Sequence, residues 1–148
     1  MESLPPQDRV ILVGHSLGGL PLSLVMERFP SKIAAAVFAT ADMPAPNLSL
    51  ATISEEFGKD TDFMDTKYRF DDGSGRPATA VFFGPKFLAS KLYQLSPPED
   101  LTLALTLVRW APIFHEELVL TMEKYGSVPK VFIMTEQDPS MDLQLLMM

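Results

Sequence analysis

The strongest constraint in this sequence is the segment GHSLG at residues 14–18, which lies between an apolar run and a helical pattern. Residues 10–13 (VILV) are rich in β-branched side chains and predict a strand buried on both faces. Residues 17–29 repeat leucines on one helical face and end at a Phe-Pro pair, which predicts a helix. The segment therefore predicts a sharp turn from strand to helix, with a serine at its centre.

Steric crowding explains why both flanking positions of this motif are glycine. In so sharp a turn, a side chain at either flanking position would collide with the backbone, so Gly14 and Gly18 leave the necessary room. Ser16 is then strained and exposed, as in a nucleophile elbow, and the Leu17 N–H is placed to stabilise an oxyanion. The alternative interpretation is a tight turn in which Ser16 only caps the helix.

Two further apolar runs complete a small sheet. Residues 33–39 (IAAAVFA) and 131–135 (VFIMT) predict strands, and the first of them forms a right-handed, parallel βαβ unit with the elbow. We therefore predict an α/β fold whose parallel sheet is built from residues 1–41 and 126–148.

Residues 42–125 have a different character, with many prolines, glycines and aromatic residues. An unstructured loop of this length is rare in a compact domain, so we predict a mostly helical cap that covers the end of the sheet. Its helices are expected at residues 49–58, 85–94, 98–109 and 113–124.

Charge and composition exclude several classes of partner and cofactor. The net charge is −7, without a cluster of basic residues, so neither nucleic acid nor an anionic membrane surface is expected to bind. There is no cysteine, which excludes disulfides, zinc–thiolate sites and a cysteine nucleophile. No metal or cofactor is expected. The chain shows no signal peptide and no apolar run of about 20 residues, so a cytoplasmic protein is expected.

A serine nucleophile needs a base and an acid that orients the base. In α/β-hydrolases the acid lies beyond the carboxyl end of a later strand, and Asp138 follows the 131–135 run by three residues. The alternative for Asp138 is an ordinary Asp-Pro turn, and Asp42, just after the second strand, is a second candidate acid. Neither histidine fits the base: His15 is next to the nucleophile, and His115 precedes Asp138, which is the wrong chain order.

The segments VILVGHSLGG, MERFPSKIAAAVFATADMP, FFGPKFLASKLYQLSPPEDL and YGSVPKVFIMTEQD resemble those of the plant methylesterases. These α/β-hydrolases cleave methyl esters of small hormones such as methyl salicylate, methyl jasmonate and methyl indole-acetate. The resemblance implies that Ser16 is the nucleophile, that Asp138 is the acid and that residues 42–125 roof the substrate pocket. Phe63, Tyr68, Val81 and Leu92 fall where members of the family line an apolar pocket, although ordinary core positions are the alternative. A homodimer is also common among such relatives.

Members of this family begin earlier and continue further than this chain, to a catalytic histidine. We therefore expect a truncated esterase that is inactive by itself. Two alternatives stay open: a hydroxynitrile lyase of the same family, and a non-catalytic product that binds a hormone or a partner protein through the cap.

Overall fold

The computed structural model describes residues 1–46, 62–73, 75–113, 115 and 118–137, and these fall into two compact units. The first unit is built from residues 1–46 and 118–137, and the second from residues 62–73, 75–113 and 115. The expected boundaries of core and cap, at residues 42 and 125, stay a prediction.

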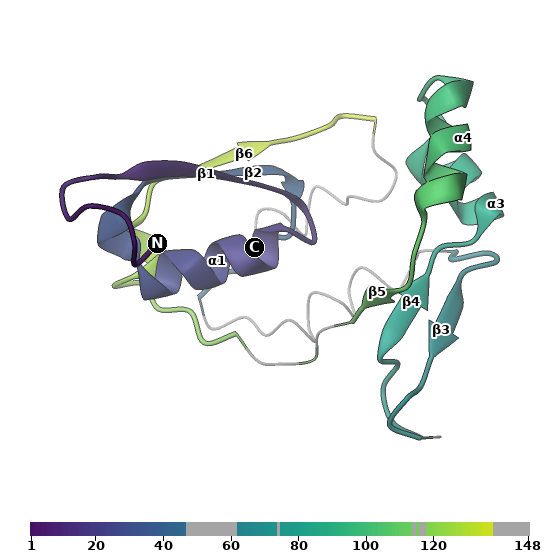
Figure 1. Ribbon diagram of the computed structural model, residues 1–148, viewed down its shortest axis with the longest axis horizontal. Helices are drawn as coiled ribbons and strands as arrows, with labels where there is room; N and C mark the ends of the chain where they lie inside the picture. The colour runs from purple at the N-terminus through teal and green to yellow at the C-terminus, as the bar shows by residue number, and fades with distance from the viewer. Residues whose placement is uncertain (47–61, 74, 114, 116–117, 138–148) are drawn as a thin grey trace. The chain divides into compact units, whose positions relative to one another are not determined.

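A parallel sheet forms the centre of the first unit (Figure 1). Its strands are β1 (Val10–Ser16), β2 (Ile33–Ala41) and β6 (Lys130–Ile133), in the order β1-β2-β6. The helix α1 (Gly19–Arg28) and the 3₁₀ turn η1 (Pro30–Lys32) connect β1 to β2. All three strands and the helix confirm the expected elements, although β1 extends three residues further than its apolar run and ends at the serine.

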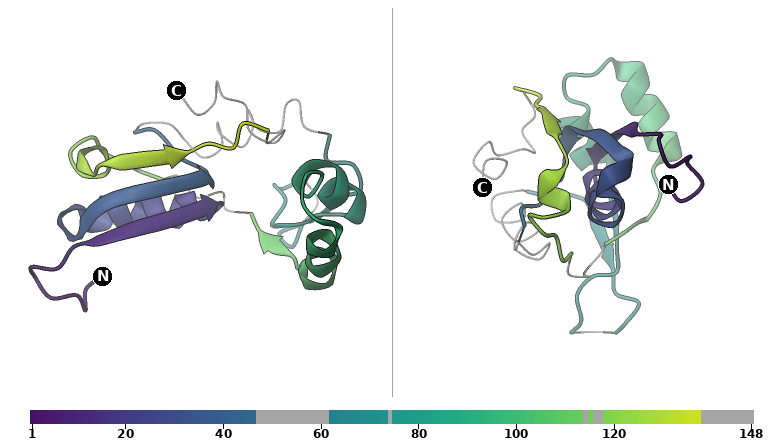
Figure 2. Two further views of the ribbon diagram at one scale, coloured as in Figure 1. Left: turned by 90° about the horizontal axis from the view of Figure 1, so that it is seen from above. Right: turned by 90° about the vertical axis from the view of Figure 1, so that its left-hand side faces the viewer.

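One face of this sheet packs against α1, as Figure 2 shows. Leu22 and Met26 lie one helical turn apart and are buried against Ile33 and Phe38 of β2. Tyr125 in the 3₁₀ turn η3 (Tyr125–Ser127) completes the same core cluster. Each such side chain stabilises the fold by about 1.5–3 kcal/mol when it is fully buried.

The opposite face of the sheet differs from the expectation that residues 10–13 form a strand buried on both faces. Ile11 and Val13 of β1 are 65% and 68% exposed, and Val131 and Ile133 of β6 are about half exposed. These side chains alternate with the buried ones, since successive residues of a strand point to opposite faces. Among the described residues only the α1 side is covered, so the prediction of two buried faces is wrong for them.

The helix expected at residues 113–124 is wrong for the part of it that the structure describes. The Glu27 carboxylate accepts hydrogen bonds from the backbone N–H groups of Thr121 (2.9 Å) and Tyr125 (3.2 Å). It also accepts one from the Thr121 hydroxyl (3.0 Å). Because a side chain of α1 satisfies these backbone donors, the segment follows the surface of α1 as a loop.

The second unit contains a short antiparallel sheet as well as helices. Its strands are β3 (Lys67–Arg69), β4 (Ala80–Phe82) and β5 (Ala111–Pro112), in the order β3-β4-β5. Its helical segments are α3 (Pro85–Phe87), the π-helix η2 (Leu88–Leu92) and α4 (Pro98–Leu107). The expected helices at residues 85–94 and 98–109 are therefore confirmed. The three strands were not predicted, because segments of two or three residues show no readable alternation.

The expected helix at residues 49–58 lies outside the described residues. Of the helices that are described, none has the length and apolar character needed to cross a bilayer.

Candidate active site

Ser16 is the last residue of β1 and has a φ of 52°. This left-handed conformation is unfavourable for a residue with a side chain, and such strain is concentrated at functional sites. A side chain on Gly14 would come within 2.8 Å of the Gly18 carbonyl oxygen, and one on Gly18 within 2.9 Å of the His15 carbonyl oxygen. The Ser16 side chain is exposed. The turn therefore has the geometry that the sequence motif predicts.

A third glycine, Gly19, allows the turn to lie close to the backbone at the end of β2. Gly19, the first residue of α1, is so close to the Asp42 backbone that a side chain on it would overlap the Asp42 carbonyl oxygen. The Asp42 N–H donates a hydrogen bond to the Ser16 carbonyl oxygen at 3.1 Å. The end of β2 therefore contacts both sides of the turn, which fixes the position of Ser16.

The Leu17 N–H lies between the end of β1 and the start of α1. The Gly18 N–H bonds the His15 carbonyl oxygen (2.9 Å), whereas the Leu17 N–H has no hydrogen-bond partner among the described residues. A free backbone donor next to an exposed serine hydroxyl can bind negative charge that develops on a substrate oxygen. The arrangement is compatible with the role that the sequence predicts for Leu17.

Of the two candidate acids, Asp138 lies outside the described residues. The described chain approaches it from the carboxyl end of β6, the sheet edge where β1 ends at Ser16, since both strands run parallel to β2. Asp42 is described and is mostly buried, with no hydrogen bond or ion pair to its carboxylate among the described residues. Burial therefore raises the pKa of Asp42 above its ordinary value.

Neither histidine is placed as a base for Ser16. His15 is exposed and precedes Ser16 in β1. His115 belongs to the second unit, where its Nε2 atom lies 2.7 Å from the Ala78 carbonyl oxygen. That contact holds the exposed ring against the segment that precedes β4.

Three of the four pocket candidates lie together in the second unit. The Phe63 and Tyr68 rings meet edge to face with centroids 6.3 Å apart, and Phe63 stacks on Phe87 at 5.6 Å. Val81 of β4 pairs directly with Tyr68 of β3, so their side chains share one face of the small sheet. These residues form an apolar and largely aromatic surface.

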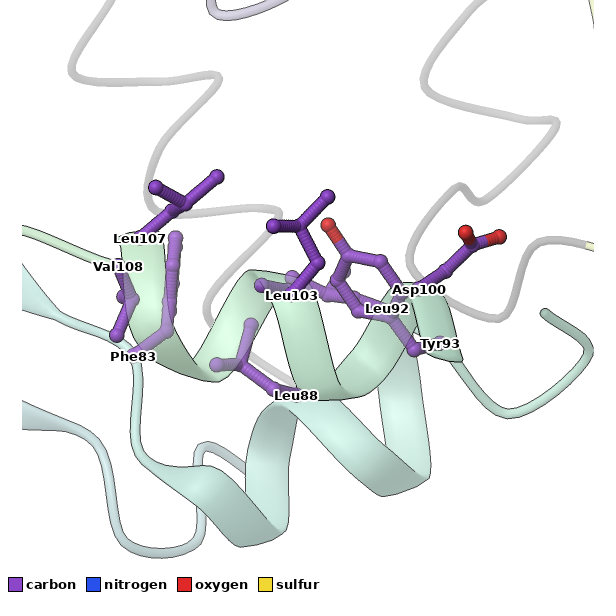
Figure 3. Close-up of a pocket in the computed structure, with 9 residues that line it drawn as sticks. Phe83, Leu88, Leu92, Tyr93, Asp100, Leu103, Leu107 and Val108 are labelled. Carbon is purple, nitrogen blue, oxygen red and sulfur yellow. The ribbon is translucent and has the colours of Figure 1, made fainter. Parts of the chain in front are cut away.

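Leu92 lies elsewhere, in a groove of about 510 Å³ between η2 and α4 (Figure 3). The lining is apolar except for the Tyr93 hydroxyl and the Asp100 carboxylate. The lining residues are Phe83, Leu88, Leu92, Tyr93, Asp100, Leu103, Ala104, Leu107 and Val108. The structure therefore does not bring Leu92 together with the other three candidates.

Thr40 is a feature of the sheet edge that no sequence pattern indicates. It is the penultimate residue of β2 and has a φ of 43°. Its hydroxyl contacts the segment that follows β6, where the Thr135 hydroxyl lies 3.1 Å away. A threonine in a strand normally has an extended backbone, so only the three-dimensional structure could show this residue at the site.

Comparison with known proteins gives consistent similarities. The family model described as the alpha/beta hydrolase fold matches residues 2–146. Methyl jasmonate esterase 1 of Vitis vinifera is 49% identical over 145 residues, which cover 93% of this chain and 56% of that protein. Salicylic acid-binding protein 2 of Nicotiana tabacum is 46% identical over 145 residues, with the same coverage of 93% and 56%.

Among solved structures, a variant of tomato methylketone synthase I in complex with beta-ketoheptanoate has a TM-score of 0.82 and is 39% identical. The match covers 99% of this chain and 58% of that one. The chain spans about half the length of the curated relatives it matches. These similarities confirm the resemblance to plant methylesterases inferred from the sequence.

Proposed function

Because this chain belongs to the alpha/beta hydrolase fold family, we propose that it carries the nucleophile of a serine carboxylesterase. The proposed substrates are methyl esters of small plant hormones of the salicylate, jasmonate or indole-acetate type. The esterase named for methyl jasmonate, at 49% identity, supports this class of substrate.

The observation that carries the proposal is the strained conformation of Ser16, with a φ of 52° between two glycines that have no room for a side chain. An N-cap serine needs no such strain, and the residue at the N-cap of α1 is Gly18 rather than Ser16. The strain exposes the hydroxyl at the carboxyl edge of the sheet, where α/β proteins bind their ligands.

The proposed reaction begins when the Ser16 Oγ atom attacks the ester carbonyl and loses its proton to a base. The carbonyl oxygen becomes an oxyanion, which accepts a hydrogen bond from the Leu17 N–H. The bond to the methoxy oxygen then breaks, and methanol leaves with the proton that the base had taken. A water molecule hydrolyses the acyl-serine in the same way, which releases the carboxylic acid and restores Ser16.

The proposed reaction needs a base that takes the proton of the Ser16 hydroxyl. His15 adjoins Ser16 on the same strand, and His115 is bound to the Ala78 carbonyl in the second unit, so we assign the role to neither. Asp138 is proposed as the acid that orients the base. We accordingly propose that residues 1–148 by themselves do not turn over esters, since removal of the base alone lowers kcat by a factor of about 10⁶.

The aromatic surface of the second unit is proposed to contact the acyl group. Phe63, Tyr68 and Val81 offer flat apolar contacts that suit a ring-bearing acid, and Leu92 would contribute through its own groove. The unit containing these residues would then correspond to the cap at residues 42–125. The proposal also includes a cytoplasmic location and a homodimer, which cell fractionation and light scattering would test.

A second candidate function is ligand binding without turnover. The relative named as a salicylic acid-binding protein, at 46% identity, favours it. Saturable binding of a small aromatic acid, with no ester turnover in any natural form of the protein, would establish this alternative.

The first experiment is the intact mass of the protein purified from its own tissue. A species at 16.4 kDa directs the search to binding partners, whereas a heavier species carrying these peptides is the form to assay for ester turnover. In that form, Ser16→Ala is expected to abolish hydrolysis of methyl esters. Turnover that survives Ser16→Ala would overturn the proposed nucleophile, and turnover by pure residues 1–148 would overturn their proposed inactivity.

A further inference from the structure

The carboxyl edge of the parallel sheet holds a second strained residue beside the elbow. Ser16 and Thr40 are the two non-glycine residues of positive φ among the described residues of the first unit, at 52° and 43°. The conformation is especially unfavourable for threonine, because its side chain branches at Cβ. Strain of this kind persists only where the surrounding contacts impose it.

The pairing of β1 with β2 shows where this strain arises. His15 pairs with Ala39 and Ser16 pairs with Ala41, so Thr40 has no partner residue on β1. One extra residue on one strand is a bulge, and bulges redirect a side chain next to active sites. The bulge here lies directly opposite the elbow.

The redirected side chain reaches toward β6. The Thr40 hydroxyl lies 3.1 Å from the Thr135 hydroxyl and donates to the Ile133 carbonyl oxygen at 3.5 Å. Both bonds are satisfied when Thr135 donates to Thr40 and Thr40 donates to Ile133. Thr40 therefore fixes the chain where it leaves β6, three residues before Asp138.

We propose that Thr40 is a positioning residue, whose hydroxyl fixes the segment between β6 and Asp138 and so orients the acid toward the base of Ser16. The inference rests on the proposed function, because it assigns Thr40 an effect only through Asp138. Thr40 itself is not required to touch the substrate. A displaced acid would misalign the base and lower the rate of the chemical step without weakening substrate binding.

The test uses the form of the protein that hydrolyses methyl esters, with Ser16→Ala as the reference for loss of the nucleophile. Thr40→Val keeps the branched shape and removes the hydroxyl, whereas Thr40→Ser keeps the hydroxyl. We expect Thr40→Val to lower kcat about 10- to 100-fold with KM changed less than about 2-fold, and Thr40→Ser to restore most of the activity. Thr135→Val, outside the bulge, should lower kcat in the same way.

A double-mutant comparison separates positioning from structure. In an Asp138→Asn background, Thr40→Val should cause no further loss, because two residues that act through one group are not additive. Thr121→Val is the matched control, since its hydroxyl also makes a hydrogen bond in the same unit, to Glu27. It should lower the melting temperature and leave kcat unchanged.

The possible results test the positioning role of Thr40 separately from the proposed function. If Ser16→Ala is inactive and both Thr40→Val and Thr135→Val keep the parent kcat, the inference is wrong and the proposed function stands. The inference also fails if the losses from Thr40→Val and Asp138→Asn multiply, or if Thr40→Ser restores nothing. If Thr40→Val does not fold, Thr135→Val decides alone. Activity that survives Ser16→Ala rejects both proposals together.

Discussion

The two ends of the β1-β2-β6 sheet are built on different principles. At the amino end, Glu27 accepts hydrogen bonds from Thr121 and Tyr125, and the Arg9 guanidinium donates to the Ile33 carbonyl oxygen at 2.6 Å. At the carboxyl end, Ser16 has a left-handed backbone and Asp42 is mostly buried without a bond to its carboxylate among the described residues.

The two ends of one small sheet therefore divide between contacts that stabilise the fold and residues held under strain. The polar contacts of Glu27 and Arg9 stabilise the amino end, whereas the strained Ser16 and Thr40 lie at the carboxyl end, where a ligand can use them. Substitutions that break polar contacts at the amino end should therefore lower stability, whereas substitutions that relieve strain or remove the buried charge at the carboxyl end should raise it.

Replacement of the strained serine should have the largest effect. Ser16→Gly removes the nucleophile and also relieves the positive φ, since glycine adopts this conformation without steric cost. We expect kcat for methyl esters to fall by a factor of about 10⁶, and the free energy of unfolding to rise by about 1 kcal/mol. Steady-state kinetics and urea denaturation measure the two quantities.

Ser16→Ala is the control for this prediction, because it removes the hydroxyl and keeps the strain. Its kcat should match that of Ser16→Gly, and its stability should stay near that of the parent. Equal stabilities of the glycine and alanine variants would mean that the elbow stores no strain.

The contact between Gly19 and the end of β2 should have the next largest effect. Gly19→Ala places a methyl group on the Asp42 carbonyl oxygen, and backbone on both sides leaves little room to adjust. We expect the free energy of unfolding to fall by about 3 kcal/mol, at the upper end of the usual cost of overpacking. Gly126→Ala is the control, since its added methyl group meets only the flexible Met122 side chain and should cost less than about 1 kcal/mol. Equal losses in the two variants would contradict the close approach of β2.

Much of this arrangement was predictable because it is encoded locally. The apolar runs at residues 10–13 and 33–39 predicted strands that the structure contains. The GHSLG segment predicted the sharp turn after the first strand and the strained serine within it. These features depend on neighbours within a few positions of the chain, so a sequence pattern can indicate them.

The features that sequence reasoning missed depend on distant contacts. The loop near Thr121 replaces an expected helix because Glu27, 94 residues away, takes its backbone N–H groups. The bulge at Thr40 depends on the pairing of β2 with β1, and its hydroxyl reaches a threonine 95 residues later. Apolar periodicity records burial, and it contains no information about such long-range polar bonds.

The stabilisation of the amino end by the Glu27 carboxylate should depend on pH. Burial alone would raise the pKa of Glu27, but hydrogen bonds from Thr121 and Tyr125 and the nearby Lys124 ammonium lower it below its ordinary value of 4.5. Because the folded pKa is lowered, this stabilisation is present above the unfolded pKa and is lost as the pH falls through the folded pKa. Glu27→Gln should therefore reduce the free energy of unfolding at pH 7 by about 1–3 kcal/mol.

The difference between Glu27→Gln and the parent should shrink as the pH falls below about 4.5, when the carboxylate of the parent is protonated. Urea denaturation at a series of pH values measures this. A constant difference at every pH would mean that the negative charge of Glu27 contributes nothing. Ester turnover should stay near that of the parent, since Glu27 lies at the opposite end of the sheet from Ser16.

Replacement of Asp42 should have the smallest effect on the free energy of unfolding, with the opposite sign to the replacement of Glu27. Burial raises the pKa of Asp42, so the ionised form is disfavoured in the folded protein, and stability is lost as the pH rises through the folded pKa. Asp42→Asn should therefore be more stable than the parent at pH 7, and the gain should disappear at acidic pH. A variant less stable than the parent at pH 7 would show that the carboxylate has a favourable partner. Ester turnover of the same variant tests the choice of acid: near-parent activity supports Asp138, whereas a loss as large as that of Asp138→Asn would transfer the role to Asp42.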